Sequence, residues 1–401
     1  MSSLSRQCSE RNAATDKFPV ELWIEVFRNI SHRPTLAHIM QVNGHFCAIA
    51  EEQLYHTVSL IGQDHFSKFR FSLESSPHRA PFVQDIRLLR LEVENSSVPN
   101  ILPSFLTSLR NLRRLELTQV PDFRFTSDTP YCDALSAVQI PHLRRLRIEA
   151  GLHPYRFLTF LEAQADFLEE LEMTNTRLFK DPPVVDLLAA RRFPLLQVLE
   201  CDTLFLGGHT RIPVPPNLTH LSRSMIFGWE LPVLAQRLGT QLVGLKLDSV
   251  WLDDRSLADG PPSWSLLNVK AKFPRLRYLQ AEAPYIRNYS AIDWFPDKAV
   301  ERTDTKFPVH PDGAAPQSHS RLTIAWVFDF VIPDDCDAWE QSGTENAVRI
   351  LTALGGYVER VLLNRASRWI SVRLGAGSEV QGERKVIKEE MGNMDRYWAQ
   401  V

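Results

Sequence analysis

The segment Lys17–Ile30, KFPVELWIEVFRNI, combines a signal for helix initiation with more apolar side chains than one buried helix face requires. Pro19 suits the first position of a helix, because its fixed φ fits the helix and its missing N–H costs nothing there. Glu21 places a negative charge in the first turn, where the helix dipole favours it. The apolar residues recur every four positions: Phe18, Leu22, Val26 and Ile30, with Phe27 beside them. The segment therefore predicts an amphipathic helix.

Two further short helices are expected directly after this one. Residues 31–34, SHRP, interrupt the first helix, and Thr35 can cap the second. These segments carry apolar sets of their own: Leu36, Ile39, Met40 and Val42, then Phe46, Ile49, Ala50 and Leu54. A unit of about 45 residues buries little core by itself. We therefore expect apolar side chains that the unit cannot hide and that a partner surface would cover.

The spaced set of residues across all three segments resembles an F-box. The pattern reads Phe18-Pro19-x-Glu21-Leu22 and Val26-Phe27-x-x-Ile30, followed by Leu36, Val42, Phe46, Ala50 and Leu54-Tyr55. The resemblance implies docking on a Skp-type adaptor within an SCF-type cullin–RING ubiquitin ligase. The residues expected to bind the adaptor are Phe18, Pro19, Glu21, Leu22, Val26, Phe27, Ile30, Leu36 and Val42. The alternative interpretation is a helical cap on a repeat array, because amphipathic helices of any kind carry such stripes.

A pattern of the Leu-x-x-Leu-x-Leu type recurs through the middle of the chain. Its copies begin at Ile86, Leu112, Leu143, Leu168, Leu196, Leu218, Leu242 and Leu276. Most spacings lie in the twenties, the range of leucine-rich repeats, and the chain resembles the leucine-rich repeats that follow F-boxes. Between the copies lie helical stretches opened by proline: PSFLTSLRNL, PYRFLTFLEAQADFL, PPVVDLLAARRF and LPVLAQRL. The expected fold is α/β, a small three-helix F-box followed by an irregular solenoid with parallel strands on its concave side and helices on its convex side.

The expected domain boundaries follow from these patterns. They are 1–15 disordered N-terminus, 16–60 F-box, 61–290 solenoid, 291–320 polar loop, 321–374 last repeats and C-terminal cap, and 375–401 charged tail. Within the cap, a strand is expected in residues 321–332, a helix in 346–362 that stops at Gly355 or Gly356, and a last strand in 369–374. The tail reads as an exposed helix or a disordered segment.

The open face of the expected strands supplies the candidate target-binding residues. Side chains alternate along a strand, so the residues between the leucines point away from the core. At these positions acidic residues outnumber basic ones: Glu116, Glu149, Glu172, Glu200, Asp202, Asp248 and Glu282 are the candidates, with Glu172, Glu200, Asp202 and Asp248 at the centre. One interpretation is an acidic surface that attracts a basic segment of a target. The other is that exposed strand positions simply prefer polar residues.

Composition and motifs argue against several other classes of protein. The formal net charge of -3 lacks the basic domain that is typical of nucleic-acid binders. Five widely spaced cysteines do not predict a zinc site or a disulfide framework. No HExxH, P-loop, GxSxG or GxGxxG motif occurs, so we expect no metal, no cofactor and no catalytic site. The polar N-terminus and the short apolar runs predict a cytoplasmic or nuclear protein without a membrane partner.

The sequence thus predicts a non-catalytic substrate-recognition subunit of an SCF-type ligase. Two alternatives stay open. One is a leucine-rich-repeat interaction scaffold without a ligase role, whose N-terminal helices act only as a cap. The other is an enzyme whose site is too dispersed to recognise in the sequence.

Overall fold

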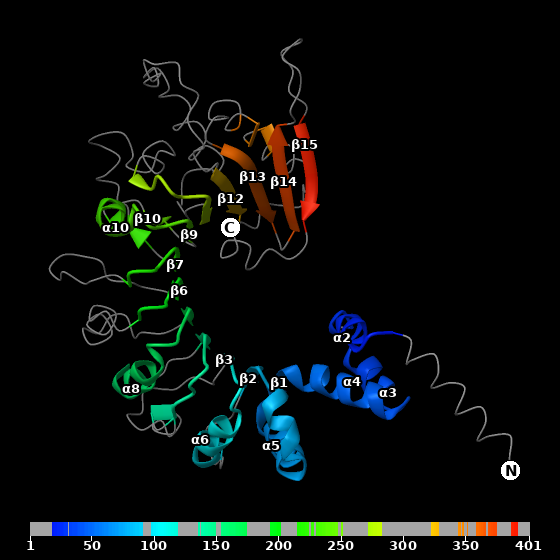
Figure 1. The fold of residues 1–401 in the computed structure, drawn as a ribbon. Helices are drawn as coiled ribbons and strands as arrows, with labels where there is room; N and C mark the ends of the chain where they lie inside the picture. Colours follow the sequence, from blue (N-terminus) through cyan, green and yellow to red (C-terminus); the bar gives the residue numbers. More distant parts are fainter. Residues whose placement is uncertain are drawn as a thin grey trace, which may run out of the picture. The chain divides into compact units, whose positions relative to one another are not determined.

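The chain is a mixed α/β protein whose strands are mostly parallel (Figure 1). The computed structural model describes residues 18–30, 32–90, 98–118, 135–136, 138–149, 154–174, 193–201, 215–223, 226–227, 230–247, 250–251, 272–282, 322–328, 344–345, 347–348, 351, 358–365, 368–374 and 386–391. It divides into two compact units, Met1–Gln164 and Ala165–Val401.

The first unit begins with three short helices: α2 (Val20–Arg28), α3 (Arg33–Ile39) and α4 (Gly44–His56). Pro19 is the N-cap of α2, one position before the predicted one, and its carbonyl accepts a hydrogen bond from the N–H of Leu22. Asn43 caps α4, because its side chain accepts a hydrogen bond from the N–H of Phe46 at 2.8 Å.

The predicted cap at Thr35 is wrong. Helix α3 begins at Arg33, so Thr35 lies inside its first turn, and His32 occupies the N-cap position. The Thr35 hydroxyl instead lies 2.9 Å from His32 Nδ1. Pro34 explains the earlier start, since a proline in the first turn of a helix loses no backbone hydrogen bond.

The three helices share one small core. Its fully buried members are Phe27, Leu36, Ile49 and Ala50, and Trp23, Ile24, Ile30, Ile39, Met40, Phe46 and Leu54 pack against them. The Phe46 ring meets the rings of Trp23 and Phe27 edge to face, with centroids 4.7 and 5.4 Å apart. Each helix thus contributes its apolar stripe to a shared interior.

Four parallel strands follow in the described residues of the first unit, in the order β1-β2-β3-β4. They are β1 (Thr57–Ile61), β2 (Asp85–Leu89), β3 (Arg114–Thr118) and β4 (Arg145–Glu149). The accompanying helices are α5 (Gly62–Ser75), the 3₁₀ helix η1 (Pro77–Phe82), α6 (Val98–Ser108) and α8 (Pro154–Gln164). Phe66 of α5 and Phe105 of α6 are in contact, with ring centroids 4.9 Å apart.

The strands predicted from the leucine pattern are confirmed at β2, β3 and β4, whereas β1 and α5 were not predicted. Strand β1, TVSLI, lacks the full leucine pattern, but its alternating burial matches that of a sheet strand. Gly62, with φ of 75°, turns the chain directly from β1 into α5. Helix α6 begins five residues earlier than the predicted Pro103, which lies inside it.

The second unit contains nine strands of one sheet among its described residues, in the order β5-β6-β7-β9-β11-β12-β13-β14-β15. The first seven are parallel: β5 (Glu170–Thr174), β6 (Val198–Cys201), β7 (His220–Arg223), β9 (Gly244–Leu247), β11 (Tyr278–Glu282), β12 (Leu322–Phe328) and β13 (Val358–Arg365). Strands β14 (Arg368–Leu374) and β15 (Val386–Met391) complete it as antiparallel neighbours. Strands β8 (Ile226–Phe227) and β10 (Val250–Trp251) pair separately, and helix α10 spans Glu230–Leu238.

In the C-terminal region, residues 347–348 and 351 are helical, as expected for the helix that stops at Gly355 or Gly356, and strand β13 begins after that stop, at Val358. One prediction for this region is wrong. The segment read as an exposed helix or disordered tail contains strand β15, which pairs with β14 from Trp369 to Leu374. Strand β15 has the sequence VIKEEM, and charged residues of this kind are usual on the edge strand of a sheet.

The leucines of the repeated pattern form the core, as predicted. Leu115 and Leu146 in the first unit, and Leu199, Leu221 and Leu245 in the second, are almost completely buried. Three predicted segments lie outside the described residues: the N-terminus 1–15, the loop 291–320 and most of the helix PPVVDLLAARRF. Within the described part of the chain, no helix is both long enough and apolar enough to traverse a lipid bilayer.

Candidate docking surface

Helix α2 has apolar side chains on two opposite sides. On the inner side, Phe27 is only 3% exposed and belongs to the helical core. On the outer side, Leu22 and Val26 lie one turn apart and are 51% and 50% exposed. Phe18, just before the helix, is 57% exposed. A helix that is apolar on both sides is usually covered on both, so the outer side is a candidate docking surface.

The residues predicted to bind an adaptor fall into two groups. Six are exposed: Phe18, Pro19, Glu21, Leu22, Val26 and Val42. Phe27 and Leu36 are core residues, and Ile30 is partly buried against them. Only the exposed group can meet a partner directly; the others hold α2 and α3 in place from beneath.

Sequence reasoning missed three further exposed apolar residues of the first unit. Val20 begins α2 and is 39% exposed, Ile61 ends β1 and is 50% exposed, and Phe71 of α5 is 69% exposed. Phe71 stands in a helix whose buried residues are Phe66 and Leu73, so its own exposure is not required by that packing. The signal that could have found it is its position in the helical period, on the side away from Phe66.

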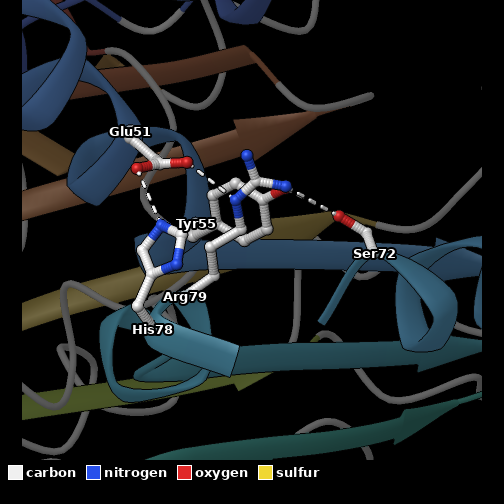
Figure 2. A network of polar contacts seen from close by, with 5 residues as sticks. All are labelled: Glu51, Tyr55, Ser72, His78 and Arg79. Carbon is white, nitrogen blue, oxygen red and sulfur yellow. Dashed lines mark hydrogen bonds and ion pairs between the residues drawn. The ribbon is translucent and has the colours of Figure 1, made fainter. Parts of the chain in front are cut away.

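A network of polar contacts joins α4, α5 and η1 beside the start of β1 (Figure 2). Arg79 Nε donates a hydrogen bond to Glu51 Oε1 at 2.7 Å, and its Nη1 donates to Ser72 Oγ at 3.3 Å. The Tyr55 hydroxyl lies 2.9 Å from the same Ser72 oxygen, and the Arg79 guanidinium stacks over the Tyr55 ring at 5.1 Å. His78 Nε2 lies 3.3 Å from the second Glu51 oxygen. Side chains from α4 and α5 therefore converge on the Arg79 guanidinium of η1.

The network favours the charged form of Arg79 further. Desolvation by burial lowers its pKa, but the hydrogen bond to Glu51 and the interaction with Tyr55 raise it, and the net pKa lies above the ordinary value. Glu51 is mostly buried, so this ion pair is better shielded from solvent than a typical surface pair.

Helix α4 passes into β1 without an intervening residue. His56 is the last helical residue and Thr57 the first of the strand. The His56 carbonyl accepts a hydrogen bond from the N–H of Gln84, and the Thr57 carbonyl accepts one from Arg33 Nη2. Together with the Arg79 network, these bonds attach the three helices to the first strands of the sheet.

The predicted acidic surface is not acidic at Glu116. Glu116 of β3 is in register with Arg87 of β2 and Arg147 of β4, on the face opposite the leucines. Its carboxylate forms ion pairs with Arg87 at 3.3 Å, Arg114 at 3.4 Å and Arg147 at 3.8 Å. Glu116 is also 8% exposed, so it is a buried counter-ion for three arginines. The set of residues expected on this surface left out Arg87 and Arg114. Because both form ion pairs with Glu116, the charge around Glu116 is not acidic.

The other predicted acidic residues are only partly brought together. Glu172 and Glu200 are register partners on β5 and β6, and Glu200 forms an ion pair with Lys246 at 3.3 Å. Glu149 is half-buried at the end of β4. Glu282 ends β11, and its side chain lies outside the described residues, as do Asp202 and Asp248.

Polar side chains on the corresponding face of the second unit are deeply buried. Ser222 of β7 is fully buried, as is Tyr278 of β11, whose hydroxyl donates a hydrogen bond to Gln280 Oε1 at 2.9 Å. His220 of β7 lies beside Thr219, with its Nδ1 2.9 Å from the threonine hydroxyl. Burial lowers the pKa of His220 to about 4. Near neutral pH this imidazole is therefore neutral.

Among the described residues, no group of three or more His, Cys, Asp or Glu side chains is placed to hold a metal ion.

No known protein-family model matches this chain. A comparison with curated proteins likewise finds no match. The functional interpretation therefore depends on the residues and their geometry.

Proposed function

We propose that this chain is a substrate-recognition subunit of an SCF-type cullin–RING ubiquitin ligase. In this proposal the three N-terminal helices form an F-box that docks on a Skp-type adaptor. The strands that follow form a leucine-rich-repeat solenoid, with the strands on its concave side, and this solenoid binds the target protein.

The observation that carries the proposal is the exposed apolar face of α2. Phe18, Leu22 and Val26 are each at least half exposed, although the same helix already fills its own core with Phe27. Burying a Val, Leu or Phe side chain fully is worth about 1.5–3 kcal/mol. Leaving three of them in water forgoes several kcal/mol, which docking on an apolar adaptor surface would recover.

The attachment of the helices to the sheet supports the same role. A ligase subunit of this kind contributes no catalytic group; it raises the effective concentration of the target lysine near the ubiquitin donor. That effect requires the docking helices and the target-binding strands to keep a defined relative position. The direct passage from α4 into β1 and the Glu51–Arg79 ion pair provide this within the first unit.

The proposal is tested by affinity purification of the tagged full-length chain, with and without proteasome inhibition, followed by mass spectrometry. We expect a Skp-type adaptor and a cullin to co-purify with the wild-type chain, and target proteins to accumulate under inhibition. Pro19→Ala combined with Leu22→Ala should abolish adaptor capture. Wild-type levels of adaptor with the double variant would contradict the F-box assignment, and an absence of adaptor from both samples would favour the scaffold alternative.

A further inference from the structure

Ser76 lies at the junction of two helices, beside the polar network of Arg79. It is the C-cap of α5 and the N-cap of η1, and it is partly exposed. Its N–H donates to the carbonyls of Ser72 and Leu73 at 3.1 and 3.2 Å, and its carbonyl accepts a hydrogen bond from the N–H of Arg79 at 3.1 Å. Among the described residues its hydroxyl makes no capping hydrogen bond. The backbone of Ser76 is therefore fixed by its neighbours, whereas the hydroxyl takes no part in capping.

The residues around Ser76 are accessible to a second protein. Ser75 and Pro77 are exposed, and the His78 side chain is 62% exposed. Ser76, Pro77, His78 and Arg79 form the pattern serine or threonine, proline, any residue, then arginine or lysine, which proline-directed protein kinases accept. This pattern occurs once in the chain. An accessible hydroxyl thus stands in a segment of the kind that such a kinase can recognise.

The Arg79 side chain is placed to change partners if a negative group is added at Ser76. Its Nε donates to Glu51 Oε1 at 2.7 Å and its Nη1 donates to Ser72 Oγ at 3.3 Å, so the guanidinium contacts both α4 and α5 (Figure 2). Ser72 precedes Ser76 by one helical turn, and Arg79 follows Ser76 by three residues. A phosphate on Ser76 would therefore be attached within one turn of the residues that hold the guanidinium.

We propose that Ser76 is a phosphorylation site and that its phosphate withdraws Arg79 from Glu51. In the modification, Ser76 Oγ forms a bond to the γ-phosphorus of ATP as the bond to ADP breaks, and the hydroxyl proton passes to the catalytic carboxylate of the kinase. The proposal concerns the contact between α4 and η1, and it does not depend on which partner docks on α2.

The phosphate is the stronger partner for the guanidinium. Phosphoserine carries about −1.5 to −2 charges at pH 7 and has three acceptor oxygens, whereas a carboxylate has one charge and two oxygens. Arginine also binds phosphate through two parallel hydrogen bonds. After the exchange, the Glu51 side chain, which is only 13% exposed, keeps His78 at 3.3 Å but loses its ion pair with Arg79. A mostly buried carboxylate without that partner is destabilising, so α4 should open more readily from η1.

The first measurement tests whether Ser76 is modified. The purified full-length chain is incubated with ATP and a proline-directed protein kinase of the cyclin-dependent class, and tandem mass spectrometry locates the phosphate. Ser75→Ala is the matched control, because Ser75 is adjacent and exposed but is not followed by proline. We expect the wild type and Ser75→Ala to be phosphorylated at Ser76, and Ser76→Ala to lose this labelling. No phosphate at Ser76, or equal labelling of this segment in both variants, would overturn the proposal.

The second measurement tests the change of partner without a kinase. Phosphoserine is incorporated during translation at position 76, or at position 75 as the control, and amide hydrogen exchange of α4 is followed at pH 7 in the full chain. We expect phosphoserine at 76 to accelerate this exchange about fivefold or more, and phosphoserine at 75 less than about twofold. Circular dichroism melting should show that each protein is folded.

The Arg79→Gln variant shows whether the effect passes through Arg79. Its ion pair with Glu51 is already absent, so phosphoserine at position 76 should cause no further acceleration of α4 exchange in this variant. Equal acceleration by phosphoserine at 75 and at 76 would overturn the proposal, and so would an undiminished effect in Arg79→Gln. Neither measurement uses the adaptor, so a failure here is distinct from a failure of the proposed docking.

Discussion

The N-terminal helices and the strands that follow differ in how many of their apolar side chains are exposed to solvent. Eight large apolar residues are exposed among the described residues, and five of them lie in or beside the three N-terminal helices: Phe18, Val20, Leu22, Val26 and Val42. Ile61 ends β1 and Phe71 lies in α5. Among the described residues after Phe71, only Leu195 is exposed in this way. The short helical region thus exposes more large apolar side chains than the longer region of repeated strands does, among the described residues.

The difference follows from how each region builds its core. A repeated strand is covered by the next copy, so every leucine of the pattern finds a neighbour of the same kind. Among the described residues, the three short helices have no such neighbour on the outer side of α2, where Leu22 and Val26 are exposed. The comparison teaches that the apolar side chains of the repeated strands are covered within the chain, whereas Leu22 and Val26 on the outer side of α2 stay exposed among the described residues.

The largest expected effect distinguishes the inner from the outer apolar residues of the helical region. Phe27→Ala removes the central ring of the small core and should destabilise α2–α4 by about 3–5 kcal/mol. Val42→Ala removes a side chain that is 65% exposed and should change stability by less than about 0.5 kcal/mol. Amide hydrogen exchange of the α4 backbone measures both in the full chain. Similar losses of protection in the two variants would mean that Val42 is buried in solution.

The next prediction concerns the buried polar face of the second unit. The folded-state pKa of His220 is about 4, below the ordinary value of 6.5. Unfolded chains therefore bind more protons than folded ones between these values, and stability should fall as the pH drops from about 6.5 to about 4. The full loss is about 3 kcal/mol from a shift of this size. His220→Gln should flatten this part of the profile in urea denaturation series; an unchanged slope would show that His220 is accessible to water.

A smaller effect is expected from the network that attaches the helices to the sheet. A double-mutant cycle with Glu51→Ala and Arg79→Ala should give a coupling energy of about 1–2 kcal/mol, because the Glu51 side chain is only 13% exposed. The exposed i,i+4 pair Arg70–Glu74 is the control and should give about 0.3–0.5 kcal/mol. Thermal unfolding at pH 7 provides the four stabilities of each cycle. Equal coupling energies for the two pairs would contradict the view that the Glu51–Arg79 ion pair helps to attach the helices to the sheet.

Much of the fold could be predicted from the sequence where one pattern repeats. The leucines between Ile86 and Leu276 specify strands because the same spacing recurs and each copy must bury its leucines. Strand β1 was missed because it carries only half of that pattern, with Val58 and Leu60 buried. Strand β15 was missed because its charges at Lys388 and Glu389 suggested a solvated tail. Its pairing with β14 depends on residues distant in the sequence, so the local pattern does not reveal it.

The candidate sites were predictable in part. Periodicity placed Leu22 and Val26 with Phe27 in a single set, but only the packing of α4 shows which of them turn inward. The charge of the strand surface could not be judged strand by strand. Considered by itself, Glu116 predicts an acidic position on the strand surface. When β2, β3 and β4 are in register, its carboxylate lies among three arginines.

The most direct measurement of the docking claim is the affinity of the purified chain for a purified Skp-type adaptor. It compares two variants that remove similar exposed apolar surface: Leu22→Ala with Val26→Ala on α2, and Ile61→Ala with Phe71→Ala outside it. Truncated anchors at the centre of an interface cost about 2 kcal/mol or more each, so the α2 variant should bind at least a hundredfold more weakly by calorimetry. The second variant should stay within twofold of wild type. Equal affinities for all three proteins, or no binding by the wild-type chain, would contradict the assignment of α2 as the docking helix.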